Sequence, residues 1–250
     1  MKLHLPAVML CMLLATSAQA ASPIRVEARG SVRHPGMHTL PADARLSAAA
    51  LAARPNGNAY MLGAALLREQ AIPAQSRLKV GLLFDLELLA AQPKVADAAT
   101  RMRDAFQRMP VTGRVAQMLD PRPLEATPTQ DTPARSGDRF IYPTRPDTIT
   151  VIGAVITPCT LRHDALTTAA AYRAQCPVLP AAGSDDLHVI QPDGSHRKVG
   201  IALWNREPAA SLAPGAVVFV PLADHLVRAT APTFNEEAAA FLATQVMDAR

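Results

Sequence analysis

The sequence is poor in aromatic residues and lacks the motifs of several common enzyme classes. Aromatic side chains make up 4% of its 250 residues, so its core must be built mainly from Leu, Val and Ala. It contains no Gly-x-Ser-x-Gly elbow, no His-Glu-x-x-His motif, no phosphate-binding glycine loop and no Cys-x-x-Cys pair. These absences argue against a serine hydrolase, a zincin, a P-loop enzyme and a thioredoxin-like oxidoreductase.

Strong charge and long apolar runs are also missing. The chain has 25 Lys and Arg against 21 Asp and Glu, a formal charge of +4. Basic residues do not cluster with aromatic ones, as they do on many nucleic-acid-binding surfaces. After the N-terminal segment, no apolar stretch approaches the roughly 20 residues that a membrane-spanning helix needs. We therefore expect no nucleic-acid partner and no transmembrane span in the mature chain.

The first 20 residues have the three-part pattern of an export signal. Lys2 provides a basic start, an apolar run of about 11 residues follows, and small residues end at Ala20. Because that run is shorter than a spanning helix, the sequence predicts that residues 1–20 are a signal peptide cleaved after Ala20. An uncleaved membrane anchor is the alternative.

Two cysteines remain once Cys11 leaves with the signal peptide. Cys159 and Cys176 are 17 positions apart, and an even pair in an exported chain predicts a disulfide. Such a bond contributes roughly 3 kcal/mol in the chain-entropy model. Two separate buried thiols are the alternative, because spacing does not show that the Cβ atoms meet.

An internal repeat organises the mature chain. Residues 30–36 (GSVRHPG) and 153–159 (GAVITPC) share Gly, Val and Pro at one spacing, offset by 123. Residues 137–143 and 215–221 each run from a Gly through an apolar stretch to a Pro, offset by 78. We interpret each copy as a strand hairpin, an alanine-rich helix and further strands, with a hairpin turn at 193–194 in the second copy.

The falling offset predicts an insertion in the first copy. Residues 79–82 (KVGL) match 198–201 (KVGI) at an offset of 119, so the fall to 78 gives the first copy 41 extra residues. Apolar residues recur at helical spacing from Val95 to Met109. The sequence therefore predicts a helical hairpin inserted at about 85–120.

Two further segments have patterns of their own. Residues 120–135 contain four prolines, which predicts an extended connection without a fold of its own. Residues 226–250 are predicted as a C-terminal amphipathic helix, with Asn235 as its N-cap and Phe241 on its apolar face. This helix either docks on its own domains or meets a partner.

The order of strand hairpin, helix and further strands is typical of a β-grasp domain. The predicted fold class is therefore α+β, with two tandem β-grasp domains at 21–147 and 148–225. The helical hairpin interrupts the first domain, and the amphipathic helix follows the second.

These features resemble a known family. Gly-x-Val-x-x-Pro-Gly at 30–36, followed by a helix, and Gly-Asp-x-x-x-x-Pro at 137–143 resemble the SLBB (soluble ligand-binding β-grasp) class. The whole organisation over residues 24–248, with local matches at 109–114 and 190–194, is similar to GfcC-type capsule biosynthesis proteins. The resemblance implies a periplasmic, non-enzymatic accessory protein in capsule or exopolysaccharide assembly or export, without a cofactor. Its expected partners are the surface polysaccharide, the outer-membrane polysaccharide export complex, or both.

Arg114 and Trp204 are the candidate ligand-binding residues. Arg114 follows Gly113 among apolar residues, and an arginine in such surroundings needs a fixed partner. Contact with an acidic sugar or a partner carboxylate is one hypothesis, and an internal salt bridge is the other. Trp204 is the single tryptophan, and an aromatic face stacks well on a sugar ring, although a core position is the alternative.

No catalytic residue is predicted. Residues 194–196 place a serine beside a histidine in a turn, where adjacent side chains need not converge. A glycan hydrolase would need two carboxylates facing one cleft. Asp85 with Glu87 fits a helix start, and Asp185 with Asp186 fits a turn. A periplasmic glycan hydrolase and a structural adaptor of the export channel remain the alternative functions.

No metal site is predicted either. His34 and His38 flank the first hairpin turn, but no cysteine or acidic residue accompanies them. We expect both to be solvated loop histidines.

Overall fold

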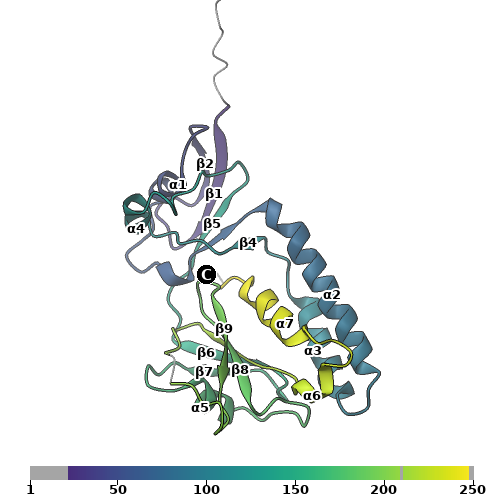
Figure 1. The fold of residues 1–250 in the computed structure, drawn as a ribbon. Helices are drawn as coiled ribbons and strands as arrows, with labels where there is room; N and C mark the ends of the chain where they lie inside the picture. The colour runs from purple at the N-terminus through teal and green to yellow at the C-terminus, as the bar shows by residue number, and fades with distance from the viewer. Residues whose placement is uncertain (1–21, 209–210, 248–250) are drawn as a thin grey trace, which may run out of the picture.

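In the computed structural model, the chain forms two five-stranded mixed sheets with several helices, an α+β arrangement (Figure 1). The structure describes residues 22–208 and 211–247. The predicted signal peptide, its cleavage site after Ala20 and the last three residues of the predicted terminal helix lie outside this range.

The first sheet has the strand order β2-β1-β5-β3-β4. Its strands are β1 (Ile24–Gly30), β2 (Gly36–Leu40), β3 (Ala65–Leu67), β4 (Arg114–Val115) and β5 (Arg139–Tyr142). β1 pairs parallel with β5, and the other neighbours are antiparallel. Because side chains alternate along a strand, Val26, Phe140 and Tyr142 point to one face, where they share a core with helix α1 (Leu46–Ala53).

The second sheet has the strand order β7-β6-β10-β8-β9, the counterpart of the first. Its strands are β6 (Thr148–Gly153), β7 (Cys159–Arg162), β8 (Asp186–Ile190), β9 (His196–Gly200) and β10 (Val217–Val220). The parallel pair is β6 with β10, and the remaining pairs are antiparallel. Helix α5 (Ala169–Ala174) packs against this sheet as α1 packs against the first.

The two sheets repeat one hydrogen-bonding pattern. The amide of Ser31 donates to Tyr142 O at 2.6 Å, and its counterpart Ala154 donates to Val220 O at 2.9 Å. These pairs keep the offsets of 123 and 78 found in the sequence. Gly153, at φ +103°, has no room for a side chain, since a Cβ there would collide with the carbonyl oxygen of Val220. A glycine is therefore required where the first strand of the second sheet ends.

The match between residues 79–82 and 198–201 is wrong. Residues 79–82 lie inside helix α2 (Ile72–Ala90), whereas Lys198 lies on β9. The true counterpart of β9 is β4, because Leu66 pairs with Val115 as Val189 pairs with Arg197. The offset thus stays at 123 through β3 and falls to 82 at β4, so 41 extra residues lie between these strands.

Those extra residues form a helical hairpin of α2 and α3 (Ala96–Arg108), as predicted, but it begins earlier and spans 72–108 rather than 85–120. Pro73 starts α2 in the first turn, where its missing N–H is tolerated. Leu82 and Leu86 of α2 and Phe106 of α3 are buried in a core that they share with the second sheet. The insertion in the first half of the chain therefore packs against the second half (Figure 1).

Residues 120–135 are not merely an extended connection. They include helix α4 (Pro121–Ala126), whose N-cap Asp120 accepts a hydrogen bond from Arg122 N at 3.2 Å. Leu124 is buried in the same core as α1, which explains why a proline-rich segment forms a helical turn here. The short elements that complete the fold are η1 (Met61–Gly63), η2 (Glu69–Ala71) and α6 (Asp224–Val227).

The terminal helix α7 (Phe234–Ala243) lies between the helical hairpin and the second sheet (Figure 1). The rings of Phe241 and Phe106 of α3 meet edge to face, with centroids 5.9 Å apart. The helix therefore docks on its own chain. Its N-cap residue is Thr233, so the prediction of Asn235 is wrong. Asn235 is buried within the helix and accepts a hydrogen bond from Leu222 N at 3.0 Å. In the described part of the chain, no helix is long and apolar enough to cross a membrane.

Candidate functional site

A cavity of about 650 Å³ lies between the open edge of the first sheet and the turn that joins β8 to β9. We call it the inter-sheet groove. On one side, Met61, Leu62 and residues 116–118 line it, and on the other side Asp193 and Ser195. Its volume falls within the range of about 300–1,000 Å³ that is usual for small-molecule sites. The groove is therefore formed jointly by residues from both halves of the chain.

The groove combines an apolar wall with a polar rim. Leu62 and Met118 are partly exposed in it, while Asp120 and Asp193 supply carboxylates. The Gln117 side chain donates to Gln130 O at 3.0 Å and so ties the sheet edge to the loop that closes the groove. Apolar surface beside hydrogen-bond acceptors suits a ligand that has both C–H faces and hydroxyl groups.

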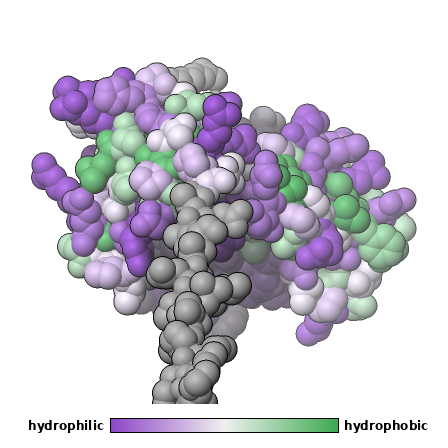
Figure 2. Space-filling view, turned by 90° about the horizontal axis from the view of Figure 1, so that it is seen from above, coloured by the Kyte–Doolittle hydropathy of each residue, from purple (hydrophilic) through white to green (hydrophobic). Residues whose placement is uncertain are grey.

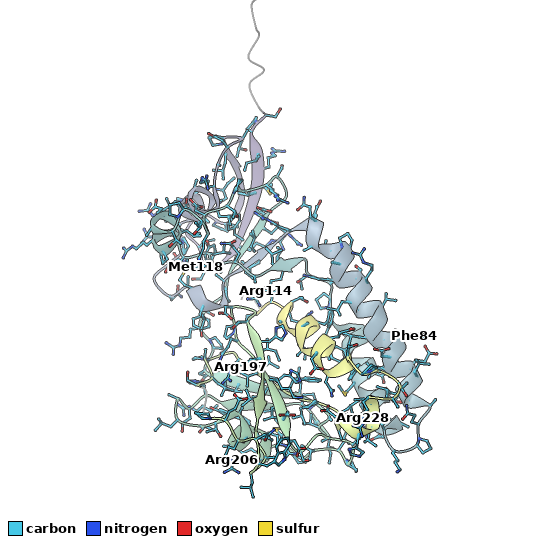
Figure 3. The ribbon with its side chains drawn as sticks, in the orientation of Figure 1. Phe84, Arg114, Met118, Arg197, Arg206 and Arg228 are labelled. Atoms are coloured by element: carbon cyan, nitrogen blue, oxygen red, sulfur yellow. A yellow bond between two sulfur atoms is a disulfide. The ribbon has the colours of Figure 1, made fainter. Side chains whose placement is uncertain are left out.

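Arg114 lies on β4 beside this groove and is buried, with 7% of its surface exposed (Figure 3). Its Nη1 donates to Gln245 O at 2.8 Å, and its Nη2 donates to Pro192 O in the β8–β9 turn. Burial lowers the pKa of Arg114 below its ordinary value, and the nearby Asp193 carboxylate acts in the opposite direction. The side chain thus connects the first sheet to the second sheet and to the segment after α7.

The partners of Arg114 are carbonyl oxygens, and within the described residues it forms no ion pair with a carboxylate. The hypothesis of an internal salt bridge is therefore wrong in its chemistry, although the arginine does hold parts of the fold together. Contact with a ligand stays a prediction. Sequence reasoning identified the residue but not its partners, because Pro192 and Gln245 are 78 and 131 positions away.

Gly194 lets the β8–β9 turn approach Arg114. It adopts φ +85°, and a Cβ at this position would lie 3.1 Å from Ala243 O and 3.4 Å from Arg114 Cζ. A larger residue would therefore push the turn away from both α7 and the guanidinium. The Pro-Asp-Gly sequence predicted the turn, but it gave no sign of this close approach.

Trp204 does not lie in the core, since 77% of its surface is exposed. Its neighbour Leu203 is 89% exposed, in the loop that follows β9. A separate cavity of about 380 Å³ borders this loop and includes Ile201 and Arg206. Trp204 lines neither this cavity nor the inter-sheet groove, so the structure does not bring the two predicted ligand-binding residues together.

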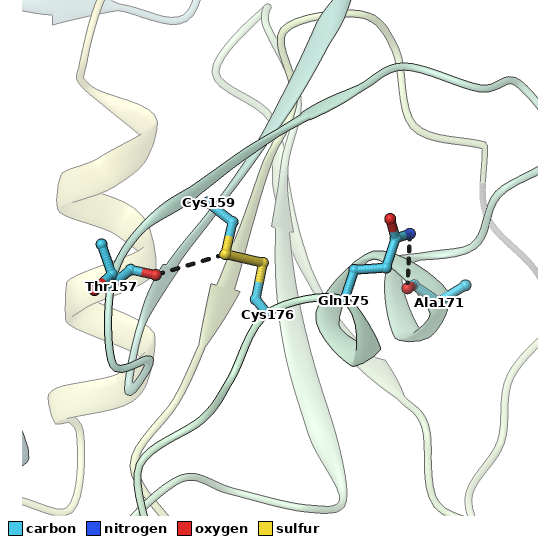
Figure 4. The surroundings of a disulfide bond; sticks show 5 residues. All are labelled: Thr157, Cys159, Ala171, Gln175 and Cys176. Carbon is cyan, nitrogen blue, oxygen red and sulfur yellow. Dashed lines mark hydrogen bonds between the residues drawn. A yellow bond between two sulfur atoms is a disulfide. The ribbon is translucent and has the colours of Figure 1, made fainter.

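Cys159 and Cys176 form a disulfide in the structure, with their Cα atoms 6.1 Å apart (Figure 4). The bond joins the start of β7 to the segment just after α5. At an offset of 123, the corresponding residues of the first sheet are Gly36 and Ala53. The crosslink is therefore specific to the second sheet.

The adjacent Ser195 and His196, which were not predicted to be catalytic, have structural roles. Ser195 Oγ donates to Asp193 Oδ1 at 2.6 Å, and Ser195 N donates to the same oxygen at 2.8 Å. These bonds close the turn and engage the hydroxyl. His196 begins β9 and makes no hydrogen bond to Ser195 in the described residues.

The two carboxylate pairs considered above, Asp85 with Glu87 and Asp185 with Asp186, do not line the inter-sheet groove. Partial burial raises the pKa of Asp85, and the nearby Glu237 of α7 raises it further. Asp186 pairs instead with Lys198 at 3.1 Å. The two carboxylates that do line the groove, Asp120 and Asp193, are far apart in sequence, so spacing could not reveal them.

The histidines of the first hairpin bind backbone atoms. His38 Nε2 is 2.9 Å from His34 O, and His34 Nδ1 is 3.2 Å from Ala52 O. Across residues 22–208 and 211–247, no group of three or more His, Cys, Asp or Glu side chains could hold a metal ion.

Comparison with known proteins shows a family match for part of the chain. Residues 162–247, which include β8, β9, β10 and α7, match the family model described as "Capsule biosynthesis GfcC C-terminal". This match confirms the resemblance to the GfcC-type capsule biosynthesis proteins. The chain is also 27% identical over 182 residues to "Uncharacterized protein YjbG" of Escherichia coli (strain K12). That similarity covers 72% of this chain and 74% of YjbG.

Proposed function

We propose that this GfcC-type chain is a periplasmic, non-enzymatic accessory protein in the assembly or export of capsule or related exopolysaccharide. The match to a capsule biosynthesis family supports the biological setting. The N-terminal export pattern supports a location outside the cytoplasm. In this proposal the chain binds the polymer directly and contacts the export complex.

We propose the inter-sheet groove as the polymer-binding site. The single observation that carries this proposal is a cavity of about 650 Å³ between the two halves of the chain. Its wall comes from the segments that precede β3 and follow β4, and its rim includes Asp193 and Ser195 of the β8–β9 turn. Met61 and Met118 offer apolar contact to sugar C–H groups, and Asp120 and Asp193 offer acceptors to sugar hydroxyls. Arg114 is the positioning residue that holds the β8–β9 turn against the groove.

We further propose that each sheet with its helix is an SLBB-like β-grasp domain, at 21–147 and 148–225. Two features support this assignment: a helix crosses one face of each sheet, and both sheets have one strand order. The shared offset of 123 from β1 through β3 supports a duplication.

A glycan hydrolase is the second candidate, because Asp120 and Asp193 line one groove. Glycosidases use two carboxylates on opposite sides of the scissile bond. Here, however, Asp120 caps α4 and Asp193 closes a tight turn, and these roles account for both positions. The non-enzymatic function therefore explains the groove with fewer assumptions.

The proposal is tested by incubating the purified mature protein with surface polysaccharide from the source organism. Ala116 is exposed at the groove, so Ala116→Trp fills the cavity without disturbing a core. Ala171→Trp on the exposed side of α5 is the matched control. We expect saturable binding without chain shortening, lost in Ala116→Trp and retained in the control. Chain shortening would establish the hydrolase instead, and an absence of binding would favour an adaptor that does not touch sugar.

A further inference from the structure

One face of each sheet packs against a helix, α1 in the first sheet and α5 in the second. The two sheets differ in what covers the opposite face. In the second sheet, His188 and Phe219 face α3 and α7 and are buried. At the offsets of the repeat, their counterparts in the first sheet are Ala65 and Ile141. Only the inner part of this face is covered in the first sheet, where Ala65, Leu67 and Ile141 pack with Val246. On the outer part of this face, Arg25 and Arg29 of β1 and Met37 and Thr39 of β2 are exposed among the described residues.

The open part of the first sheet carries arginines. Because Val26 and Ala28 point into the core with α1, Arg25, Glu27 and Arg29 must point to the opposite face of β1. Arg139 joins them, since it is next to Glu27 in the parallel pairing of β1 with β5. We call these four residues the arginine face.

The second sheet has no charge at the corresponding positions. The counterparts of Arg25, Glu27, Arg29 and Arg139 are Thr148, Thr150, Ile152 and Val217. Ile152 and Val217 pack against the hydrophobic core. Positions that hold apolar side chains against the core in the second sheet therefore hold arginines in the first sheet. The sheet architecture itself does not require these arginines.

The arginine face has a net positive charge, because it contains three arginines and one glutamate. Arg29 Nε pairs with Glu27 at 2.7 Å, and its side chain is still 57% exposed. Arg25 and Arg139 form no ion pair within the described part of the chain. Alternate residues of a strand are about 6.5 Å apart, and adjacent strands are about 4.8 Å apart. Arg25 and Arg29 are therefore about 13 Å apart along β1, and Arg139 lies beside Glu27 on the neighbouring strand.

The distribution of charge along the chain agrees with this local pattern. Residues 22–147 contain 17 Lys and Arg against 12 Asp and Glu, a balance of +5. Residues 148–250 contain 7 against 9, a balance of −2. From the end of the molecule that carries the first sheet, hydrophilic side chains cover much of the surface (Figure 2). An anionic partner would therefore be drawn to the first sheet.

We propose that the arginine face binds a carboxylated polysaccharide. This proposal rests on the proposed function and adds to it a second contact and the charge of the polymer. Guanidinium groups match carboxylates in shape and charge, and several of them on one face suit a chain that bears repeated carboxylates. An anionic membrane is less suited, because Met37 is the one large apolar side chain exposed on the described strands β1, β2 and β5.

The test uses the full mature protein and two probes, polygalacturonate as a carboxylated chain and dextran as a neutral one. The variant Arg25→Thr/Arg139→Thr removes the two arginines that have no carboxylate partner. Arg206→Thr/Arg228→Thr removes two exposed arginines near the second sheet and changes the net charge equally (Figure 3). We expect saturable, salt-sensitive binding of polygalacturonate and little binding of dextran. The first variant should bind about tenfold more weakly, and the control within about twofold of wild type.

Equal weakening in both variants would overturn the proposal, because net charge rather than the arginine face would then govern binding. So would the absence of polygalacturonate binding, or arginine-dependent binding to anionic phosphatidylglycerol vesicles alone. The groove variant Ala116→Trp distinguishes an error in the arginine-face proposal from an error in the proposed function. If Ala116→Trp abolishes binding of the native polymer and the arginine variant binds that polymer normally, the proposed function is supported and the arginine face takes no part in it.

Discussion

Arg114 on β4 donates a hydrogen bond from Nη2 to the carbonyl oxygen of Pro192, at the turn between β8 and β9. A second bond, from Nη1 to Gln245 O at 2.8 Å, reaches the segment after α7. One buried side chain of the first sheet therefore holds two segments of the second half of the chain. The α2–α3 hairpin makes a second connection, through the core that it shares with α7 and the second sheet.

Replacing Arg114 with Ala should destabilise the protein strongly. The change leaves the carbonyl groups of Pro192 and Gln245 without their charged donor, and we expect a loss of about 2–3 kcal/mol in the free energy of unfolding. Arg114→Lys should recover only part of this loss, because an ammonium lacks the planar fork that reaches both oxygens. Urea unfolding measures both changes. Arg206→Ala is the exposed control and should change stability by less than about 0.5 kcal/mol. If Arg114→Ala were as stable as that control, the connecting role would be excluded.

Removing the disulfide should destabilise the second sheet. Cys159→Ser/Cys176→Ser opens a loop with a sequence separation of 17, and we expect a loss of roughly 3 kcal/mol by chemical denaturation. Adding a reductant to the wild-type protein should produce a similar loss, and adding it to the double variant should produce none. Peptide mass mapping without reduction should recover the two cysteines in one linked fragment. Recovery of two free thiols from the oxidised protein would contradict the bond.

His188 should make stability depend on pH. Burial lowers its pKa below the ordinary value of 6.5, with smaller influences from the charged groups around it. Those groups are Glu236, Lys198, His196 and Asp186. Because the fold favours the neutral ring, the unfolded chain binds more protons below about pH 6.5, so the free energy of unfolding should fall as the solution is acidified.

The variant His188→Leu tests this dependence. Nε2 of His188 is buried without a hydrogen-bond partner among the described residues. Replacing the ring with an apolar side chain therefore breaks no hydrogen bond at this atom. We expect a shallower fall in thermal stability between about pH 7.5 and 5 than in wild type. His225→Gln, at an exposed position, should keep the wild-type slope. Identical slopes in His188→Leu and wild type would show that another group causes the acid sensitivity.

Asp85→Asn should stabilise the protein at neutral pH. Partial burial and Glu237 raise the pKa of Asp85 above its ordinary 3.8, so the fold disfavours the charged carboxylate. As the pH rises above about 3.8, Asp85 ionises less readily in the folded protein than in the unfolded chain, so the free energy of unfolding falls. Asn cannot ionise, so the variant does not lose this stability. We expect a gain of roughly 0.5 kcal/mol or less at pH 7, shrinking to nothing below about pH 3.8. Thermal unfolding at several pH values measures it, with Glu87→Gln as the exposed control. A gain that persisted in acid would point to a cause other than charge.

The parts of the fold that could be predicted from sequence depend on short-range chemistry. The glycines at 30 and 153 end a strand at positive φ, and their turns keep one spacing from the neighbouring Val and Pro. The periodicity of α3 likewise lies within 13 residues. Such signals identified the repeat, the helical hairpin and a terminal helix, but they left open whether that helix docks on its own chain.

The errors came from similarities without structural support. Residues 79–82 resemble 198–201 at three of four positions, but the first set lies inside a helix of 19 residues and the second ends a hairpin. The true partner, β4, has two residues and so offers too little pattern to find. The groove was also beyond prediction, because its lining comes from three segments that are distant in sequence, residues 61–64, 116–132 and 193–195.

If the chain serves polysaccharide assembly or export, cells that lack its gene should carry less polysaccharide on their surface. We expect wild-type protein to restore the surface polymer, and we expect Ala116→Trp, secreted and folded at the normal level, not to restore it. An unchanged amount of surface polymer after deletion would exclude this function.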